Sequence, residues 1–291
     1  MYKFPRTEVA GVSLPRMLMG TNWILGYSHT GAAADSLIHE RNDAAASTRE
    51  IVKAYLSYGV DAMMAPFGSS EAILKGIHDA EDAMGMPVTL IDTPIINVTD
   101  SKEGRAEAEK VIATSAKNGA KFCLIHHSSA EQLVSKLHHK IDRLSDYTDM
   151  IRQHGMIPGL SAHMPELIVY SDENEYDVQT YIQIYNCMGF MMQVEVETVA
   201  NIIRNAKHPV MTIKPFAAGR TTPFVGFNFN WNVIRDCDMI TVGAHTQSEA
   251  EEDIELSFAA LEHRAPRLSG RSPPNTKQDV LQKKIDYDNA M

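Results

Sequence analysis

Short apolar runs recur along the chain at intervals of about 25 to 40 residues, and the stretches between them carry apolar residues at helical spacing. Eight runs predict strands, over residues 16–21, 61–66, 87–92, 122–126, 156–161, 177–185, 209–214 and 239–243. The intervening stretches predict helices over residues 48–58, 70–84, 105–118, 141–153, 196–206 and 248–262. Alternation of strands with helices is typical of a parallel sheet, and eight repeats favour a closed (β/α)8 TIM barrel.

Two segments interrupt this alternation. Residues 27–43 follow the first strand, at the end of the barrel where active sites are built, and we interpret them as a lid. Residues 265–275 carry three prolines and a glycine and predict an extended stretch, so residues 265–291 are expected to form an arm with a short helix that packs on the barrel or on a partner subunit. We therefore expect one catalytic barrel domain over residues 1–264, followed by this arm.

Composition and charge narrow the class of partner. The chain of 291 residues is 44% hydrophobic and 22% charged, which suits one barrel of about 250 residues with a large core. The net charge is -10, and no cluster of basic residues interrupts it, which argues against nucleic acid and against an anionic membrane surface. We expect a small-molecule substrate, and a homo-oligomer stays open.

The cysteines and the N-terminus indicate the compartment. Cys123, Cys187 and Cys237 are scattered without a C-x-x-C pair, so neither a disulfide framework nor a cysteine zinc site is indicated. The N-terminus lacks the apolar core of a secretion signal, and no apolar run approaches the roughly 18 residues of a membrane span. The expected location is the cytoplasm.

Several short motifs follow one another along nearly the whole chain. They are Met19-Gly20-Thr21, Gly68-Ser69-Ser70-Glu71, Leu124-Ile125-His126, Gly159-Leu160-Ser161-Ala162-His163, Gln183-Ile184-Tyr185-Asn186 and Lys214-Pro215-Phe216. In this order the chain resembles the aldo/keto reductase superfamily. The resemblance implies a TIM barrel that opens with a short N-terminal hairpin, and an ancestral activity of hydride transfer from NAD(P)H.

The catalytic tetrad of that family is mostly absent. By resemblance, the family uses a tyrosine as proton donor, an aspartate, a lysine and a histidine. Here the aspartate position reads Ala62, the tyrosine position reads Phe67, and the lysine position falls at or beside Asp92. A phenyl ring has no proton to donate, and Asp61 is offset by one residue onto the other strand face. Only His126 remains of the four.

The nicotinamide site is only partly matched. Ser161 and Gln183 correspond to family positions that hold the carboxamide, and we assign them to cofactor binding under an NAD(P) hypothesis. The segment after the last strand, which holds basic residues in the family, reads Gln247-Ser248-Glu249-Ala250-Glu251-Glu252-Asp253 here. Acidic residues at a helix start would repel a phosphate, so NAD(P) is the less favoured cofactor.

The polar residues that close the strands suggest a metal instead. Asp92, His126 and His163 close three successive predicted strands, so their side chains are placed to converge. Two imidazoles and a carboxylate suit a divalent metal such as Zn, Mn or Fe. The alternative is that the histidines are inherited, Asp92 contacts a substrate or a neighbour, and there is no metal.

Further ionisable residues complete the candidate site. Lys214 follows an apolar run, so burial would lower its pKa, and we assign it, with His245 and His126, to acid–base catalysis; a Schiff-base role for the lysine is a weaker alternative. His127 alternates with His126 and is expected to point into the helix layer. His29 and His39 lie in the expected lid and are predicted to face solvent.

Three functional hypotheses remain. The first is an enzyme for a small hydroxylated or carbonyl compound, sugar-like in character, that performs lyase, isomerase or hydrolytic chemistry with a divalent metal. The second is a nicotinamide oxidoreductase. The third is a noncatalytic barrel that binds a ligand or scaffolds a partner, against which stands the number of ionisable groups at the strand ends.

Overall fold

The strands close into a parallel barrel, as the alternating pattern predicts. The structure is a computed structural model that describes residues 3–41 and 44–268. The barrel strands are β3 (Met17–Gly20), β4 (Ala62–Ala65), β5 (Thr89–Asp92), β6 (Phe122–Ile125), β9 (Ile157–Ala162), β10 (Tyr181–Ile184), β11 (Val210–Ile213) and β12 (Met239–Gly243). They follow one another around the barrel in chain order, and β12 pairs with β3 to close it. The predicted (β/α)8 fold is confirmed.

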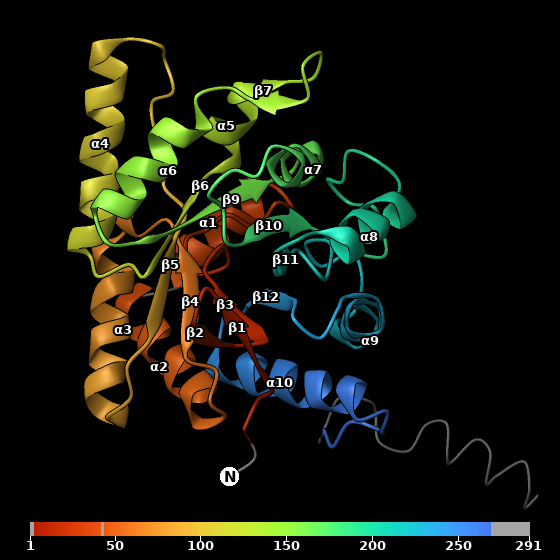
Figure 1. Cartoon of the computed structure of the whole chain (residues 1–291). Helices are drawn as coiled ribbons and strands as arrows, with labels where there is room; N and C mark the ends of the chain where they lie inside the picture. The colour runs from red at the N-terminus through yellow and green to blue at the C-terminus, as the bar shows by residue number, and fades with distance from the viewer. Residues whose placement is uncertain (1–2, 42–43, 269–291) are drawn as a thin grey trace, which may run out of the picture.

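Helices surround these strands (Figure 1). They are α2 (Ala44–Ser57), α3 (Glu71–Met84), α4 (Lys102–Lys117), α6 (Leu144–Gln153), α7 (Glu166–Glu173), α8 (Val196–Asn205), α9 (Pro223–Val233) and α10 (Gln247–Leu261). The pattern predicted all of them except α7 and α9. Helix α9 is apolar around much of its circumference and contains Gly226, a weak helix former, so it lacks the amphipathic period. The signal at its start is local: Thr222 caps it and Pro223 is its first residue.

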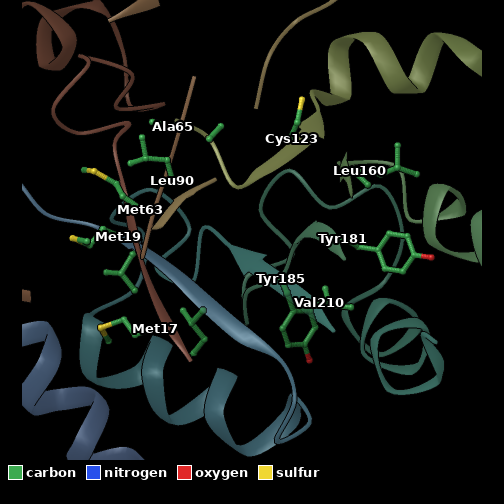
Figure 2. Close-up of a cluster of buried hydrophobic side chains, with 14 of the residues drawn as sticks. Met17, Met19, Met63, Ala65, Leu90, Cys123, Leu160, Tyr181, Tyr185 and Val210 are labelled. Atoms are coloured by element: carbon green, nitrogen blue, oxygen red, sulfur yellow. The ribbon is translucent and has the colours of Figure 1, made fainter. Parts of the chain in front are cut away.

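Each barrel strand buries both of its faces. Leu18, Met64 and Leu124 belong to the cluster inside the barrel. Met63, Leu90, Cys123 and the other residues labelled in Figure 2 belong to the larger cluster between strands and helices. Because both faces are covered, the strands read as continuous apolar runs rather than as an alternation. The face on which a residue lies therefore has to be taken from the structure.

A hairpin precedes the barrel, as the family resemblance implies. Strands β1 (Arg6–Val9) and β2 (Val12–Pro15) pair antiparallel. Val9 and Leu14 of this hairpin are buried and join the cluster inside the barrel. The hairpin therefore supplies apolar side chains to the barrel core.

Two insertions lie after strand ends. The expected lid contains helix α1 (Ala32–Arg41) between β3 and α2. After β6 come the short helix α5 (His127–Ala130), the 3-10 turn η2 (Glu131–Leu133) and a hairpin of β7 (Val134–Ser135) and β8 (Lys140–Ile141). A second 3-10 turn, η1 (Phe67–Ser69), lies after β4.

The predicted C-terminal arm lies mostly beyond the described chain. Residues 265–268 follow α10 without regular structure, and residues 269–291 are outside the described residues. The arm and its packing stay a prediction. None of the described helices has both the length and the apolar character needed to cross a membrane.

Candidate active site

A large pocket opens at the carboxyl ends of the barrel strands. Its volume is about 820 Å³. Every barrel strand contributes to its wall, either directly or through the residues just after it: Gly20, Met64, Thr93, His126, Ser161, Ile182, Ile213 and Thr241. The pocket therefore occupies the position at which barrel enzymes hold their substrates.

His126 lies in this pocket in a defined protonation state. The backbone N–H of Ser128 donates to its Nδ1 at 3.3 Å, and the Ser128 hydroxyl lies 2.7 Å from the same atom. Burial lowers the pKa of His126 to about 4, with the neighbouring His127 and Lys214 adding to the effect. The ring is therefore neutral at pH 7, and since Nδ1 accepts, the proton is on Nε2. His126 offers the pocket a neutral N–H donor.

His127 and His163 form a stacked pair beside it. Their ring centroids are 3.7 Å apart with an interplanar angle of 16°, and both line the pocket. Burial lowers the pKa of His163 to about 3, helped by His127 and Lys214. The prediction that His127 points into the helix layer was wrong, because β6 ends at Ile125 and α5 begins at His127, so strand alternation no longer applies.

Lys214 and His29 meet across the pocket although they are far apart in the chain. Nζ of Lys214 lies 3.1 Å from Nε2 of His29. Nδ1 of His29 lies 2.9 Å from the carbonyl oxygen of Tyr27, which can only accept, so Nδ1 carries the proton and Nε2 accepts from Lys214. Burial lowers the pKa of Lys214 to about 8. No carboxylate among the described residues lies within ion-pair distance of this amine.

The lid places His29 in the site. The backbone N–H and the hydroxyl of Ser28 donate to Oδ1 of Asp35, at 2.8 and 2.5 Å, which ties the turn before His29 to helix α1. Burial and the nearby Lys214 lower the pKa of His29. His29 is exposed, as predicted, but it also lines the pocket and lies against Lys214, a contact that the long-range folding of this segment creates. The exposed His39 fits the same prediction.

Lys214 has a left-handed backbone, with φ of 59°. It directly follows β11, and its side chain lines the pocket. Non-glycine residues rarely adopt this conformation. The backbone here costs free energy that a glycine would avoid.

His245 lies in the same pocket next to carboxylates. Its backbone N–H donates to Oε2 of Glu249 at 2.7 Å, and its Nδ1 lies 3.2 Å from the same oxygen. These contacts lower the pKa of Glu249. Glu249, Glu252 and Asp253 of α10 also line the pocket, so this side is acidic while the Lys214 side carries the amine.

Asp92 does not join the two histidines. It lies two residues after Leu90 and shares its outward face, so its carboxylate is in the layer between strands and helices. Oδ1 accepts from the backbone N–H of Phe67 at 3.0 Å, and burial raises the pKa of the carboxyl. Among the described residues, no three His, Cys, Asp or Glu side chains are arranged to hold a metal ion. The predicted set of Asp92, His126 and His163 is therefore not assembled.

Of the two residues assigned to nicotinamide binding, one lines the pocket and the other does not. Ser161 lines the pocket. Gln183 is fully buried between Tyr181 and Tyr185, both of which pack in the layer between strands and helices, and its amide nitrogen donates to the backbone oxygen of Ile184. Gln183 faces away from the pocket, so it does not fit the carboxamide of NAD(P). The acidic side chains of α10 do not fit its phosphate.

The positions matched to the family tetrad are scattered. Ala62 lies inside the barrel, and Phe67 is buried in the outer layer. Asp61 pairs with Arg6 at 3.0 Å, so it is occupied elsewhere. Of the predicted catalytic residues, His126, Lys214 and His245 all line one pocket, where His29, His127 and His163 join them.

Comparisons with known proteins support the fold. A putative aldo-keto reductase from Pseudomonas aeruginosa matches with a TM-score of 0.61 and 12% identity, over 88% of this chain and 95% of that one. A glycerol dehydrogenase from Gluconobacter oxydans matches with a TM-score of 0.57 and 12% identity, over 92% and 98%. Orotidine 5'-monophosphate decarboxylase from Methanocaldococcus jannaschii matches with a TM-score of 0.51 and 14% identity, over 84% and 98%.

The chain thus has an aldo/keto reductase-like barrel. Sequence comparison adds nothing further, since no family model and no curated protein matches. At such low identity, the likeness concerns the fold and leaves the activity to the site itself.

Proposed function

We propose that this protein is an enzyme that moves a proton on a small hydroxylated carbonyl compound, as an isomerase or a lyase does. The observation that carries the proposal is the pair of Lys214 and His29, 3.1 Å apart in the same pocket as the neutral His126. A half-buried amine with a pKa of about 8 is a base that works near neutral pH.

Lys214 is the proposed base. Its free amine takes a proton from the carbon next to the substrate carbonyl: the C–H bond breaks, an N–H bond forms, and the electron pair moves into an enediolate. His29 accepts a hydrogen bond from the amine and so orients its lone pair. Return of the proton to the former carbonyl carbon, with transfer of the hydroxyl proton to the former carbonyl oxygen, gives an isomer, whereas loss of a leaving group from the enediolate gives an elimination.

His126 is the proposed electrophile. Negative charge develops on the substrate oxygen when the proton leaves carbon, and a fixed N–H donor stabilises that charge. The Nε2–H of His126 is such a donor, since Nδ1 is held by Ser128. A neutral imidazole suits this role because it donates a hydrogen bond to the oxyanion and keeps its proton.

Deuterium exchange tests this function without knowledge of the natural substrate. The protein is incubated in D2O with dihydroxyacetone and with five- and six-carbon ketoses, and loss of the proton next to the carbonyl is followed by NMR. We expect exchange with the wild-type chain and at least a hundredfold slower exchange in Lys214→Met, in line with the typical weight of a general base, ~10²–10⁴. The matched control is Lys75→Met, because Lys75 pairs with Asp79 on the surface of α3.

Lys214→Arg separates a base from a binding cation. Arginine keeps the positive charge but does not deprotonate in proteins, so it should be as slow as the methionine variant. Exchange at the wild-type rate in either variant would refute the proposal.

A further inference from the structure

The barrel strand β12 carries a hydroxyl that has no partner. Thr241 is 7% exposed and lines the pocket, yet its Oγ1 is buried and makes no hydrogen bond within the described residues. A buried hydroxyl without a partner costs free energy, and most such groups in folded proteins are satisfied. Thr241 therefore needs an explanation.

A neighbouring threonine shows how the fold satisfies such a group. Thr212 of β11 is also fully buried, but it lies outside the pocket and its hydroxyl donates to the backbone oxygen of Met239 at 2.9 Å. Carbonyl oxygens are thus within reach of threonines in this barrel. Among the described residues, the hydroxyls of Tyr55, Ser171 and Thr241 are buried without a partner, and of these three residues only Thr241 lines the pocket.

A second hydroxyl lies in the pocket wall. Ser161 of β9 is 5% exposed and lines the pocket. The side chains of Ile182 and Ile213 come from the two strands between β9 and β12. Thr241 and Ser161 therefore place two hydroxyl-bearing side chains in the pocket wall, on either side of Ile182 and Ile213, and we call these four residues the pocket floor.

Glycine allows the chain to pack closely beside Thr241. A Cβ on Gly20 would lie 3.2 Å from Cγ2 of Thr241, and a Cβ on Gly243 would lie 3.0 Å from the Trp23 ring. Both glycines line the pocket. Any side chain at position 20 would fill the space next to the threonine.

We propose that the pocket floor is a binding site for a hydroxylated carbon chain, with Thr241 and Ser161 as its hydrogen-bonding groups. A neutral polyol end fits two neutral hydroxyls, and a turn about the Thr241 side chain brings its hydroxyl to the ligand. This inference deepens the proposed function by giving the substrate a polyol end that reaches the floor while its carbonyl lies at Lys214. A ligand hydroxyl would supply the partner that Thr241 lacks among the described residues.

The test compares two five-carbon alcohols, xylitol and 1,5-pentanediol, which differ in their three inner hydroxyls. Binding is measured by calorimetry and melting by calorimetric scans. Wild-type protein should bind xylitol more tightly. Thr241→Val, which keeps the shape and removes the hydroxyl, should weaken xylitol binding by about fivefold or more, the weight of one hydrogen bond to a buried group. Gly20→Ala should also weaken it.

Stability gives an independent readout. Thr241→Val removes an unsatisfied group, so its melting temperature should equal or exceed that of the wild type. The matched control, Thr212→Val, breaks a formed hydrogen bond and should melt lower with unchanged xylitol binding. Equal or undetectable affinity of the wild type for the two alcohols, or unchanged xylitol affinity in Thr241→Val, would overturn the proposal.

The two proposals fail separately. Xylitol has no carbonyl, so the effect of Thr241→Val on xylitol binding should persist in Lys214→Met. If exchange never depends on Lys214 while Thr241 still controls xylitol binding, the proton-transfer function fails and the polyol site stands. If exchange depends on Lys214 and Thr241→Val binds xylitol normally, the polyol site fails.

Discussion

At the scale of single residues, burial shifts the ionisable groups of the site toward their uncharged forms. His126 is neutral because burial outweighs any gain from charging it, and the Ser128 N–H fixes which nitrogen carries its proton. Lys214 is held near its titration point by the same burial. The pocket thus combines a donor and a base without a close ion pair between them, so each can interact with the substrate.

The pH dependence of exchange is governed by Lys214. Burial lowers the pKa of Lys214 from 10.5 to about 8, because it penalises the ammonium form. The base is the free amine, so activity should rise with pH and level off above about 8, with a tenfold loss for each unit below. His126 and His163, with pKa values of about 4 and 3, stay neutral over this range. Rates measured from pH 6 to 10 check this, and a rate that falls above pH 8 would make the ammonium the active form.

Asp92 gives a second prediction at this scale. In Asp92→Asn the amide oxygen can still accept from the Phe67 N–H, so exchange should stay within about twofold of wild type. Asp92→Ala leaves that N–H unpaired and should lower the free energy of unfolding by about 1–3 kcal/mol in denaturant titrations. The control is metal analysis of both proteins. Lost exchange in Asp92→Asn, together with lost stoichiometric metal, would restore the metal hypothesis.

At the scale of elements, the positions of the proposed catalytic groups depend on where the strands end and on the segment that comes after each strand. The pattern of apolar residues predicted the barrel strands and most helices, because the strands are continuous apolar runs and most helices have one apolar face. It did not predict which face of a strand Asp92 and Gln183 occupy, because apolar runs buried on both sides carry no alternation to read. It also missed His127, whose direction is determined by the first turn of α5, and His29, whose partner is 185 residues away.

The lid provides a prediction about an element. Asp35 holds Ser28 through two hydrogen bonds, which positions His29 on Lys214. Asp35→Ala should slow exchange to the level of His29→Ala and raise amide hydrogen exchange in residues 27–35, while the barrel strands stay protected. Asp79→Ala is the matched control, since it removes an exposed carboxylate that pairs only on the surface of α3. Full activity in Asp35→Ala would mean that the lid does not need this anchor.

At the scale of the whole molecule, the residues that form the core and the ionisable residues of the pocket lie in different parts of the barrel. The hairpin of β1 and β2 contributes to the core, whereas the ionisable side chains come from connections at the carboxyl ends of the strands. The resemblance to aldo/keto reductases concerns the scaffold, which is why it predicted the fold well and the cofactor residues poorly. Ser161 reaches the pocket and Gln183 does not, although both occupy family positions.

The left-handed backbone at Lys214 has a consequence for how this chain varies. Glycine is the residue that accepts φ of 59° at least cost, and glycine has no amine. Folding alone favours glycine at position 214, and under the proposed function it is activity that favours the lysine. A lineage that lost its substrate would therefore be expected to lose this lysine early, so the residue at this position would mark which descendants still work.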